Sequence, residues 1–213
     1  MGFPFFYTFG AFMIKKSIYN SPLGEILIIT CKNLLIGLYF ENQKEFKDLI
    51  KKDDIKSFDE RENYNKIEKI NKIQEIDKDK KISEDKIFSD TKKWLDIYFS
   101  GEEPKFIPKL KLEGTEFRKD VWEILLEIPY GKTITYKDIS EKLIASGKYK
   151  KMSNQAVGGA VGHNPISLII PCHRVVGTSG SLTGYAGGLH RKMKLLKLEG
   201  INTDKFFFPK NHK

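Results

Sequence analysis

The chain has 213 residues, enough for one large domain or two small ones, and its two cysteines are too few for a disulfide scaffold or a Cys-x-x-Cys zinc site. Residues 114–213 carry 16 Lys and Arg against 8 Asp and Glu, whereas residues 1–113 carry 21 against 20, so most of the +9 net charge lies in the C-terminal half. This asymmetry favours a polyanion such as DNA or RNA as partner, although a solvated lysine-rich surface would also explain the positive total.

The first predicted elements are three strands of an antiparallel meander. They lie in the segment KKSIYNSPLGEILIITCKNLLIGLYFE, residues 15–41, with turns at Ser-Pro-Leu-Gly and Lys-Asn. Residues 1–13 are aromatic but lack the basic region and cleavage site of a signal peptide, and Met13 is an alternative start of translation. No apolar run has the length of a membrane span, and we expect a cytoplasmic protein whose thiols, Cys31 and Cys172, are reduced.

A charged segment follows the meander. Residues 46–89 mix Lys, Asp, Glu, Asn and Ile, so parts of the segment have helical character, but we expect an insertion that carries no chemistry. A helix capped by Ser89 or Asp90 should come next and end at Gly101.

The extended segment KFIPKLKLEG predicts a domain boundary, which divides the chain into residues 1–112 and 113–213. Three short amphipathic helices are expected beyond it. Their N-caps are Thr115, Thr135 and Ser153. The third helix should end at Asn164-Pro165, a hairpin over residues 175–188 should follow, and a last helix should end at Gly200. We therefore predict an α+β protein: a small antiparallel sheet with a helix, then a helical domain of the winged helix-turn-helix type.

The third helix has two glycines at its centre. Gly158 and Gly159 each cost about 1 kcal/mol relative to alanine, so some function must require a smooth surface there. A helix that reads the major groove presents long polar side chains, whereas this helix presents mainly Ala and Gly. It suits either close approach to a nucleic-acid backbone or minor groove, or close packing against another helix. The sequence favours neither reading over the other.

The segment LIIPCHRVVG, residues 168–177, places Cys172 between a proline and a histidine. A free thiol is only a few per cent ionised at pH 7, so a nucleophilic cysteine needs a base. Neighbours on an extended strand point to opposite faces, so His173 would act through a bridging water and a carboxylate would hold its tautomer. Glu199, at the end of the last helix, is one carboxylate placed to reach back. Cys31 is expected to be an apolar filler inside its strand.

Together these motifs resemble one family. The sequence PCHRV, preceded by GHNP and followed by GYAGG and KLEG, is similar to the methylated-DNA–protein-cysteine methyltransferases, the O6-alkylguanine-DNA alkyltransferases. The resemblance is close from Thr115 to Gly200 and looser before it, where it implies a ribonuclease-H-like domain. It implies irreversible, stoichiometric transfer of an alkyl group, methyl in particular, from O6-alkylguanine or O4-alkylthymine in flipped-out duplex DNA to Cys172. It further implies a monomer that needs no cofactor and binds double-stranded DNA through the minor groove.

The resemblance also implies a role for each matching residue. Cys172 is the alkyl acceptor, His173 deprotonates it through a water, and Glu199 orients His173. Asn164 is the hinge between the recognition helix and the active-site strand. Tyr136 contacts the rotated phosphate or the flipped base and helps guanine to leave. The base pocket, its closing loop and the minor-groove surface are formed by Val175, Tyr185, Ala186, Gln155, Ala156, Gly159 and Ala160.

Two positions depart from the family pattern. Gln155 stands where members usually carry an arginine that intercalates into the vacated base stack, so base flipping should be weaker here. Phosphate attraction would then come from Lys150, Lys151 or Arg174. A zinc site, which some members have in the N-terminal domain, cannot form because Cys31 has no histidine partner in that half of the chain.

Two other functions stay open on the sequence alone. A cysteine hydrolase using Cys172 and His173 would turn over, but it gives no reason for a glycine-lined helix-turn-helix. A DNA-binding regulator without catalysis would need only the charge asymmetry and the wing. Replacing Cys172 with Ser tests these alternatives, since only the regulator would keep its function.

Overall fold

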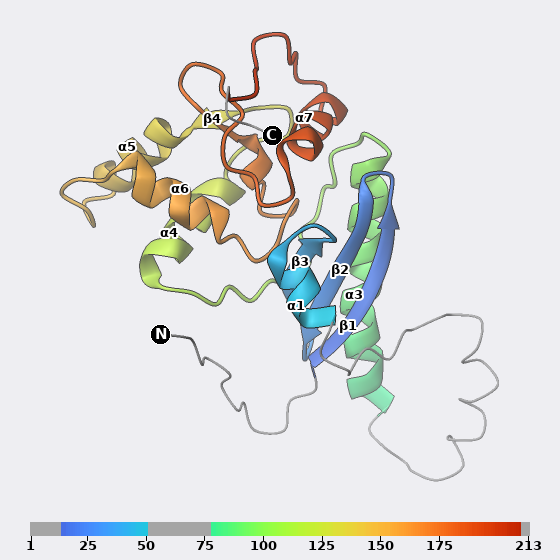
Figure 1. The fold of residues 1–213 in the computed structure, drawn as a ribbon. Coiled ribbons are helices and arrows are strands. Elements are labelled where there is room, and N and C mark those ends of the chain that lie inside the picture. Colours follow the sequence, from blue (N-terminus) through green and yellow to red (C-terminus); the bar gives the residue numbers. More distant parts are fainter. Residues whose placement is uncertain (1–13, 51–77, 210–213) are drawn as a thin grey trace.

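The structure is a computed structural model that describes residues 14–50 and 78–209 (Figure 1). The proposed alternative start at Met13 and residues 51–77 of the predicted charged insertion lie outside the described residues. The described chain forms a sheet with two flanking helices and a helical C-terminal half, which confirms the α+β prediction.

The N-terminal meander is present as predicted. Its strands are β1 (Ile14–Ser21), β2 (Gly24–Cys31) and β3 (Leu34–Phe40), antiparallel and in the order β1-β2-β3. Side chains of β2 alternate between two buried faces: Ile26 and Ile28 join the main core, and Leu27 and Ile29 pack with Phe46. Phe46 belongs to α1 (Lys44–Ile50), so the sheet is covered on one face by α1 and on the other by α3, as Figure 1 shows.

Helix α3 (Lys78–Phe99) begins much earlier than the sequence predicts. The expected caps, Ser89 and Asp90, lie inside it, so the prediction of its start was wrong. The reason is that no Gly or Pro interrupts residues 78–99, and the Lys and Glu residues before Ser89 are compatible with a helix, so the helix continues towards the N-terminus beyond both expected caps. The predicted stop is confirmed: Gly101 has a φ of 87°, and its N–H donates to the carbonyl of Tyr98 at 3.1 Å.

The C-terminal half contains the four expected helices. They are α4 (Glu116–Leu126), α5 (Tyr136–Ala145), α6 (Asn154–Gly162) and α7 (Leu189–Leu198). The N-caps of the first three are confirmed, because the hydroxyls of Thr115, Thr135 and Ser153 each accept a backbone N–H from the first turn. Helices α4, α5 and α6 pack against one another as a helix-turn-helix group.

The predicted hairpin over residues 175–188 is wrong. The strand β5 (Val175–Val176) pairs in parallel with β4 (Ile134–Thr135), which precedes α5. After β5 the chain makes a tight turn, in which the N–H of Gly177 donates to the carbonyl of Ser181 at 2.9 Å. Positive φ angles at Gly180 and Gly184 interrupt an extended return strand, which explains the difference.

The two halves share one hydrophobic core, and the outer edge of β3 joins them. The N–H of Leu35 donates to the carbonyl of Lys109 at 2.8 Å, the N–H of Leu38 to that of Pro165 at 2.9 Å, and the N–H of Ser167 to that of Leu38 at 2.9 Å. These bonds anchor the segment that leads to Cys172. The domain boundary at residue 112 stays a prediction. Within the described ranges, no helix is both long and apolar enough to span a bilayer.

Candidate active site

Cys172 lies on a single 3-10 turn, η1 (Cys172–Arg174), rather than on the expected strand. The turn follows Pro171, whose carbonyl accepts the N–H of Arg174 at 2.9 Å, while the N–H of Cys172 donates to Ile170 at 2.8 Å. The ring of Pro171 restricts its own φ, which is −81°, and this favours a turn at the end of the apolar run. The argument from opposite strand faces therefore does not apply to Cys172 and His173.

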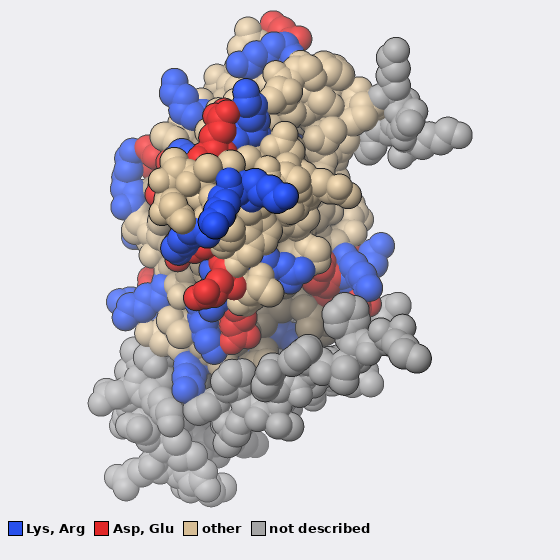
Figure 2. All heavy atoms as spheres, turned by 90° about the vertical axis from the view of Figure 1, so that its left-hand side faces the viewer, with Lys and Arg blue, Asp and Glu red and all other residues tan. Residues whose placement is uncertain are grey.

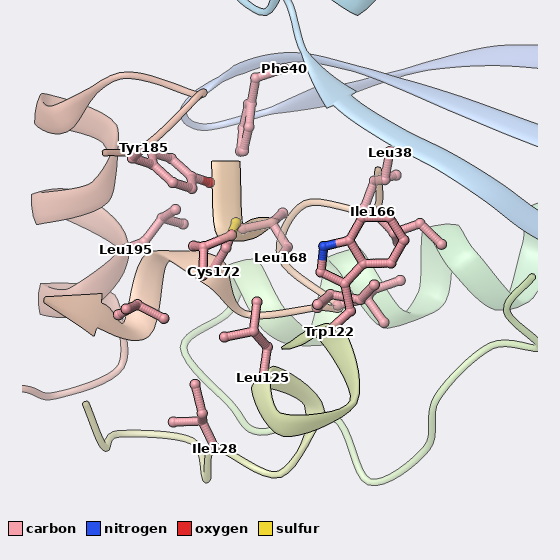
Figure 3. Close-up of a cluster of buried hydrophobic side chains, with 14 of the residues drawn as sticks. Leu38, Phe40, Trp122, Leu125, Ile128, Ile166, Leu168, Cys172, Tyr185 and Leu195 are labelled. Carbon is pink, nitrogen blue, oxygen red and sulfur yellow. The ribbon is translucent and has the colours of Figure 1, made fainter. Parts of the chain in front are cut away.

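The sulfur of Cys172 is buried, with the residue 5% exposed. Figure 3 shows it within a cluster of apolar side chains that includes Phe40, Leu168 and Leu195. Burial raises the pKa of the thiol, while a hydrogen bond from Asn164, the charge of Lys192 and backbone N–H groups act in the opposite direction.

Asn164 connects the end of α6 to this turn. Its Nδ2 donates to the carbonyl of Ile170 at 2.7 Å and to the Sγ of Cys172 at 3.1 Å, and its Oδ1 accepts the N–H of Ile166 at 3.0 Å. The side chain is buried and uses both ends of its amide. These contacts bring Asn164 to the place that the hinge hypothesis requires.

His173 and Glu199 form the close pair that the sequence suggested. Their Nε2 and Oε1 atoms lie 2.6 Å apart, and both side chains are fully buried. Burial lowers the pKa of His173, so we take the imidazole as neutral, with its proton on Nε2 facing the carboxylate. Nδ1 then has a free lone pair, and it has no hydrogen-bond partner among the described residues.

Glu199 remains ionised because several groups donate to it. Burial alone would raise its pKa, but the hydrogen bonds from His173 and Arg174 and the positive charge of Arg174 prevail and lower it to about 2. Arg174 binds it twice, from Nε to Oε2 at 2.9 Å and from Nη2 to Oε1 at 3.1 Å, and the N–H of Gly131 donates to Oε2 at 3.1 Å. Tyr98 of α3 donates from its hydroxyl to Oε1 at 2.8 Å.

Arg174 is therefore not the phosphate-binding residue that the sequence suggested. It is 8% exposed, and its Nη1 donates to the carbonyl of Ile128 at 2.6 Å. Each guanidinium nitrogen thus donates to an acceptor inside the protein, as a buried arginine requires. Lys150 and Lys151 are exposed in the turn between α5 and α6, so they remain available to a phosphate backbone.

A cleft of about 440 Å³ opens beside this site. It is lined by Tyr136, Lys137, Asn154, Gln155, Gly158, Gly177, Thr178, Thr183 and Gly184. The Tyr136 hydroxyl donates to the carbonyl of Thr183 at 3.0 Å, and burial raises its pKa, so it stays protonated. Cys172 itself does not line the cleft.

Helix α6 presents small residues beside this cleft. Ala156 and Gly159 are exposed, and a side chain added at Gly159 would meet no atom within 4 Å. Close packing against another helix is therefore not what requires Gly159. Ala160 is different: it is 3% exposed and its carbonyl accepts the indole N–H of Trp122 at 3.0 Å, so the expectation that Ala160 contacts DNA is wrong. The helical period turns Ala160 inward.

Figure 2 views the molecule from the left-hand side of Figure 1, where α4, α5 and α6 lie. Lys and Arg are scattered among Asp and Glu on this face rather than gathered into one basic stripe. Attraction of a polyanion there would depend on individual lysines more than on a uniform field.

The remaining predicted pocket residues lie on β5 and the loop after it. Val175 is buried, and its carbonyl accepts the ammonium of Lys192 at 2.5 Å. Tyr185 is buried against the His173 ring, with ring centroids 6.4 Å apart, and its hydroxyl has no partner among the described residues. Ala186 is exposed.

Sequence reasoning missed Lys192 and Tyr98. Lys192 is fully buried in α7, donates to the carbonyls of Val175 and Thr183, and has a pKa lowered by burial to about 8. One signal was present, since Lys192 lies on the same helical stripe as Leu189, Leu195 and Leu196. No sequence signal connects Tyr98 with a histidine 75 positions later.

The fold and the site together define a class: an α+β protein in which a helix-turn-helix adjoins a buried cysteine with a histidine–glutamate pair. Two family models match the chain. Residues 14–113 match the ribonuclease-like domain of 6-O-methylguanine DNA methyltransferase, and residues 116–201 match its DNA-binding domain. The chain therefore belongs to the 6-O-methylguanine DNA methyltransferase family.

Relatives are found among curated proteins and solved structures. The methylated-DNA–protein-cysteine methyltransferase of Mycobacterium tuberculosis (strain H37Rv) is 51% identical over 105 residues, 49% of this chain and 61% of the relative. That of Methanosarcina acetivorans is 54% identical over 106 residues, 50% of this chain and 65% of the relative. The matched region thus spans less than two thirds of these relatives.

Two crystal structures cover more of the chain. The O6-methylguanine methyltransferase of Mycobacterium tuberculosis is 34% identical, with a TM-score of 0.64 over 88% of this chain and 93% of that one. Mycobacterium tuberculosis OGT in complex with DNA is 32% identical, with a TM-score of 0.64 over 90% and 94% of the two chains.

Proposed function

We propose that this protein repairs DNA by transferring the alkyl group of O6-alkylguanine, methyl in particular, to the sulfur of Cys172. The observation that carries the proposal is the arrangement at the thiol. Asn164 donates to the sulfur, and the neighbouring His173 is neutral because it is buried, with its Nε2 proton facing Glu199 and its Nδ1 without a partner among the described residues. Membership of the family, and a relative whose structure contains DNA, support the choice of substrate.

The proposed reaction begins with removal of the thiol proton. His173 Nδ1 accepts that proton through a water, and Glu199 stabilises the imidazolium that forms. The thiolate attacks the alkyl carbon, an S–C bond forms as the C–O6 bond breaks, and guanine leaves as an anion. A proton from Tyr136, or later from water, neutralises the guanine, so the sum of the reaction moves one proton from sulfur to the base.

The product explains why one protein should repair one lesion. A thioether has no carbonyl for water to attack, so no second step restores the thiol, in contrast to a cysteine hydrolase. We extend the proposal to O4-alkylthymine, since its alkyl group is attached to oxygen in the same way.

The base would reach Cys172 after leaving the duplex. Flipping costs a few kcal/mol and less for a poorly paired lesion. The exposed small residues Ala156 and Gly159 support docking of α6 in the minor groove, with Gln155 and Tyr136 at the cleft. The sulfur does not line the cleft, and we propose that residues 183–186 shift to admit the base. We further propose that the protein acts as a monomer in the cytoplasm, where the thiol stays reduced.

Mass spectrometry tests the proposal. Incubation with a duplex that contains one O6-methylguanine should add one methyl mass to the peptide that carries Cys172. The Cys172→Ser variant should bind the same duplex and gain no mass. An unmodified Cys172 after incubation with excess substrate would overturn the proposal, and a DNA-binding regulator would give that result.

A further inference from the structure

Tyr98 connects the N-terminal half of the chain to the histidine–glutamate pair. It lies near the end of α3, is fully buried, and donates its hydroxyl proton to Glu199 Oε1 at 2.8 Å. The hydroxyl oxygen of Tyr98 also lies 3.2 Å from His173 Nε2. The ring is held between neighbours, stacked on Trp94 with centroids 5.2 Å apart and edge-on to the His173 ring at 6.2 Å.

The three polar groups have a definite pattern of protons. Glu199 is a carboxylate and only accepts, so Tyr98 and His173 must both donate to Oε1. The imidazole therefore carries its proton on Nε2. The same N–H can also donate a second, weaker hydrogen bond to the hydroxyl oxygen of Tyr98. Nδ1 stays an acceptor that has no partner among the described residues.

We propose that Tyr98 is a positioning residue for alkyl transfer: its hydroxyl supports the Nε2–H tautomer that Glu199 fixes and keeps the imidazole neutral by sharing the charge of Glu199. The inference rests on the proposed function, because it assigns Tyr98 a part in deprotonating Cys172. It also means that the alkyl-transfer site is completed by a residue from the N-terminal half of the chain.

The charge around His173 decides the direction of the effect. The groups that surround it are Lys192 from α7, Glu199 at the C-cap of α7, Arg174 and Cys172 from η1, Tyr98 from α3, and Tyr185 from the loop before α7. Without the Tyr98 donor, more negative charge stays on Oε1, so Glu199 attracts a proton on His173 more strongly. A protonated imidazole cannot accept the thiol proton, so activity should be lost at a higher pH than in the wild type.

The test is Tyr98→Phe, with Tyr19→Phe as the matched control. Tyr19 also donates its hydroxyl to a carboxylate of α3, Asp96 at 2.7 Å, but away from the site. The single-turnover methylation rate of Tyr98→Phe should fall about tenfold at pH 7, the size expected for one hydrogen bond to a charged group. The acid limb of its pH–rate profile should move to higher pH, whereas Tyr19→Phe should keep the wild-type profile.

Nitrogen NMR of His173 gives a readout that does not depend on alkyl transfer. The imidazole pKa should rise in Tyr98→Phe and stay unchanged in Tyr19→Phe. If the wild type methylates normally and neither the pKa nor the acid limb moves in Tyr98→Phe, the inference is wrong and the proposed function stands. If the wild type fails to methylate Cys172, the proposed function fails instead.

A second replacement covers the case in which Tyr98→Phe does not fold. With 3-fluorotyrosine at position 98 the phenol is a stronger donor, so the imidazole pKa and the acid limb should both move to lower pH. A shift to higher pH, or none, would overturn the inference.

Discussion

Replacing Glu199 with Gln removes the buried charge around which the site is assembled. The pKa of Glu199 is lowered from 4.5 to about 2, a shift that corresponds to about 3 kcal/mol of folding free energy. Because the folded-state pKa is the lower one, this stability is present above pH 4.5 and is lost as the pH falls towards 2. The variant should therefore be less stable by about 3 kcal/mol or more at pH 7, since Arg174 is also left buried without its partner.

Urea unfolding at several pH values measures the effect. The difference in unfolding free energy between the wild type and Glu199→Gln should shrink by about 2 kcal/mol between pH 7 and pH 3. Glu127→Gln is the control, because the Glu127 carboxylate pairs with Lys142 at 3.0 Å on the surface and should contribute less than about 1 kcal/mol. A difference that does not change with pH, or one matched by the control, would refute the reasoning.

Two further variants test the thiol and the proposed DNA surface. Asn164→Asp loses the Nδ2 donor 3.1 Å from the sulfur and adds negative charge, so the pKa of Cys172 should rise by about one unit or more. The pH dependence of iodoacetamide alkylation measures this pKa, and an unchanged value would contradict the prediction. The leucine side chain of Gly159→Leu enters open space, so the free energy of unfolding in urea should stay the same or rise by up to about 1 kcal/mol. Duplex binding, measured by fluorescence anisotropy, should weaken about tenfold or more. Unchanged binding would exclude this face as the DNA contact.

Local chemistry explains which elements could be predicted from the sequence. The caps at Thr115, Thr135 and Ser153 act within one turn of each helix, so a few neighbouring residues determine them. The continuous apolar run in β2 is likewise a local feature, because its side chains point alternately to two faces of the sheet that are both buried. The start of α3 could not be found in this way, because Ser89 and Asp90 are compatible with a helix interior when the flanking residues are helical as well.

The structure brings together those predicted site residues whose order in the chain carried the information, while their roles stay predictions. Cys172, His173 and Asn164 are near in sequence and meet in the structure, and Glu199 reaches back as expected. Arg174 and Ala160 were wrongly placed at the DNA surface, since burial depends on tertiary packing that single residues do not reveal. Tyr98 was missed for the same reason, as only tertiary packing brings the end of α3 to Glu199.

The central claim is that Cys172 takes an alkyl group and never releases it, and titration of the protein against a radiolabelled O6-methylguanine duplex tests this most directly. Labelled methyl should accumulate in the protein until it reaches one equivalent per thiol and then stop, however much duplex is added. Continued demethylation of the DNA beyond one equivalent, with the protein left unlabelled, would contradict the account.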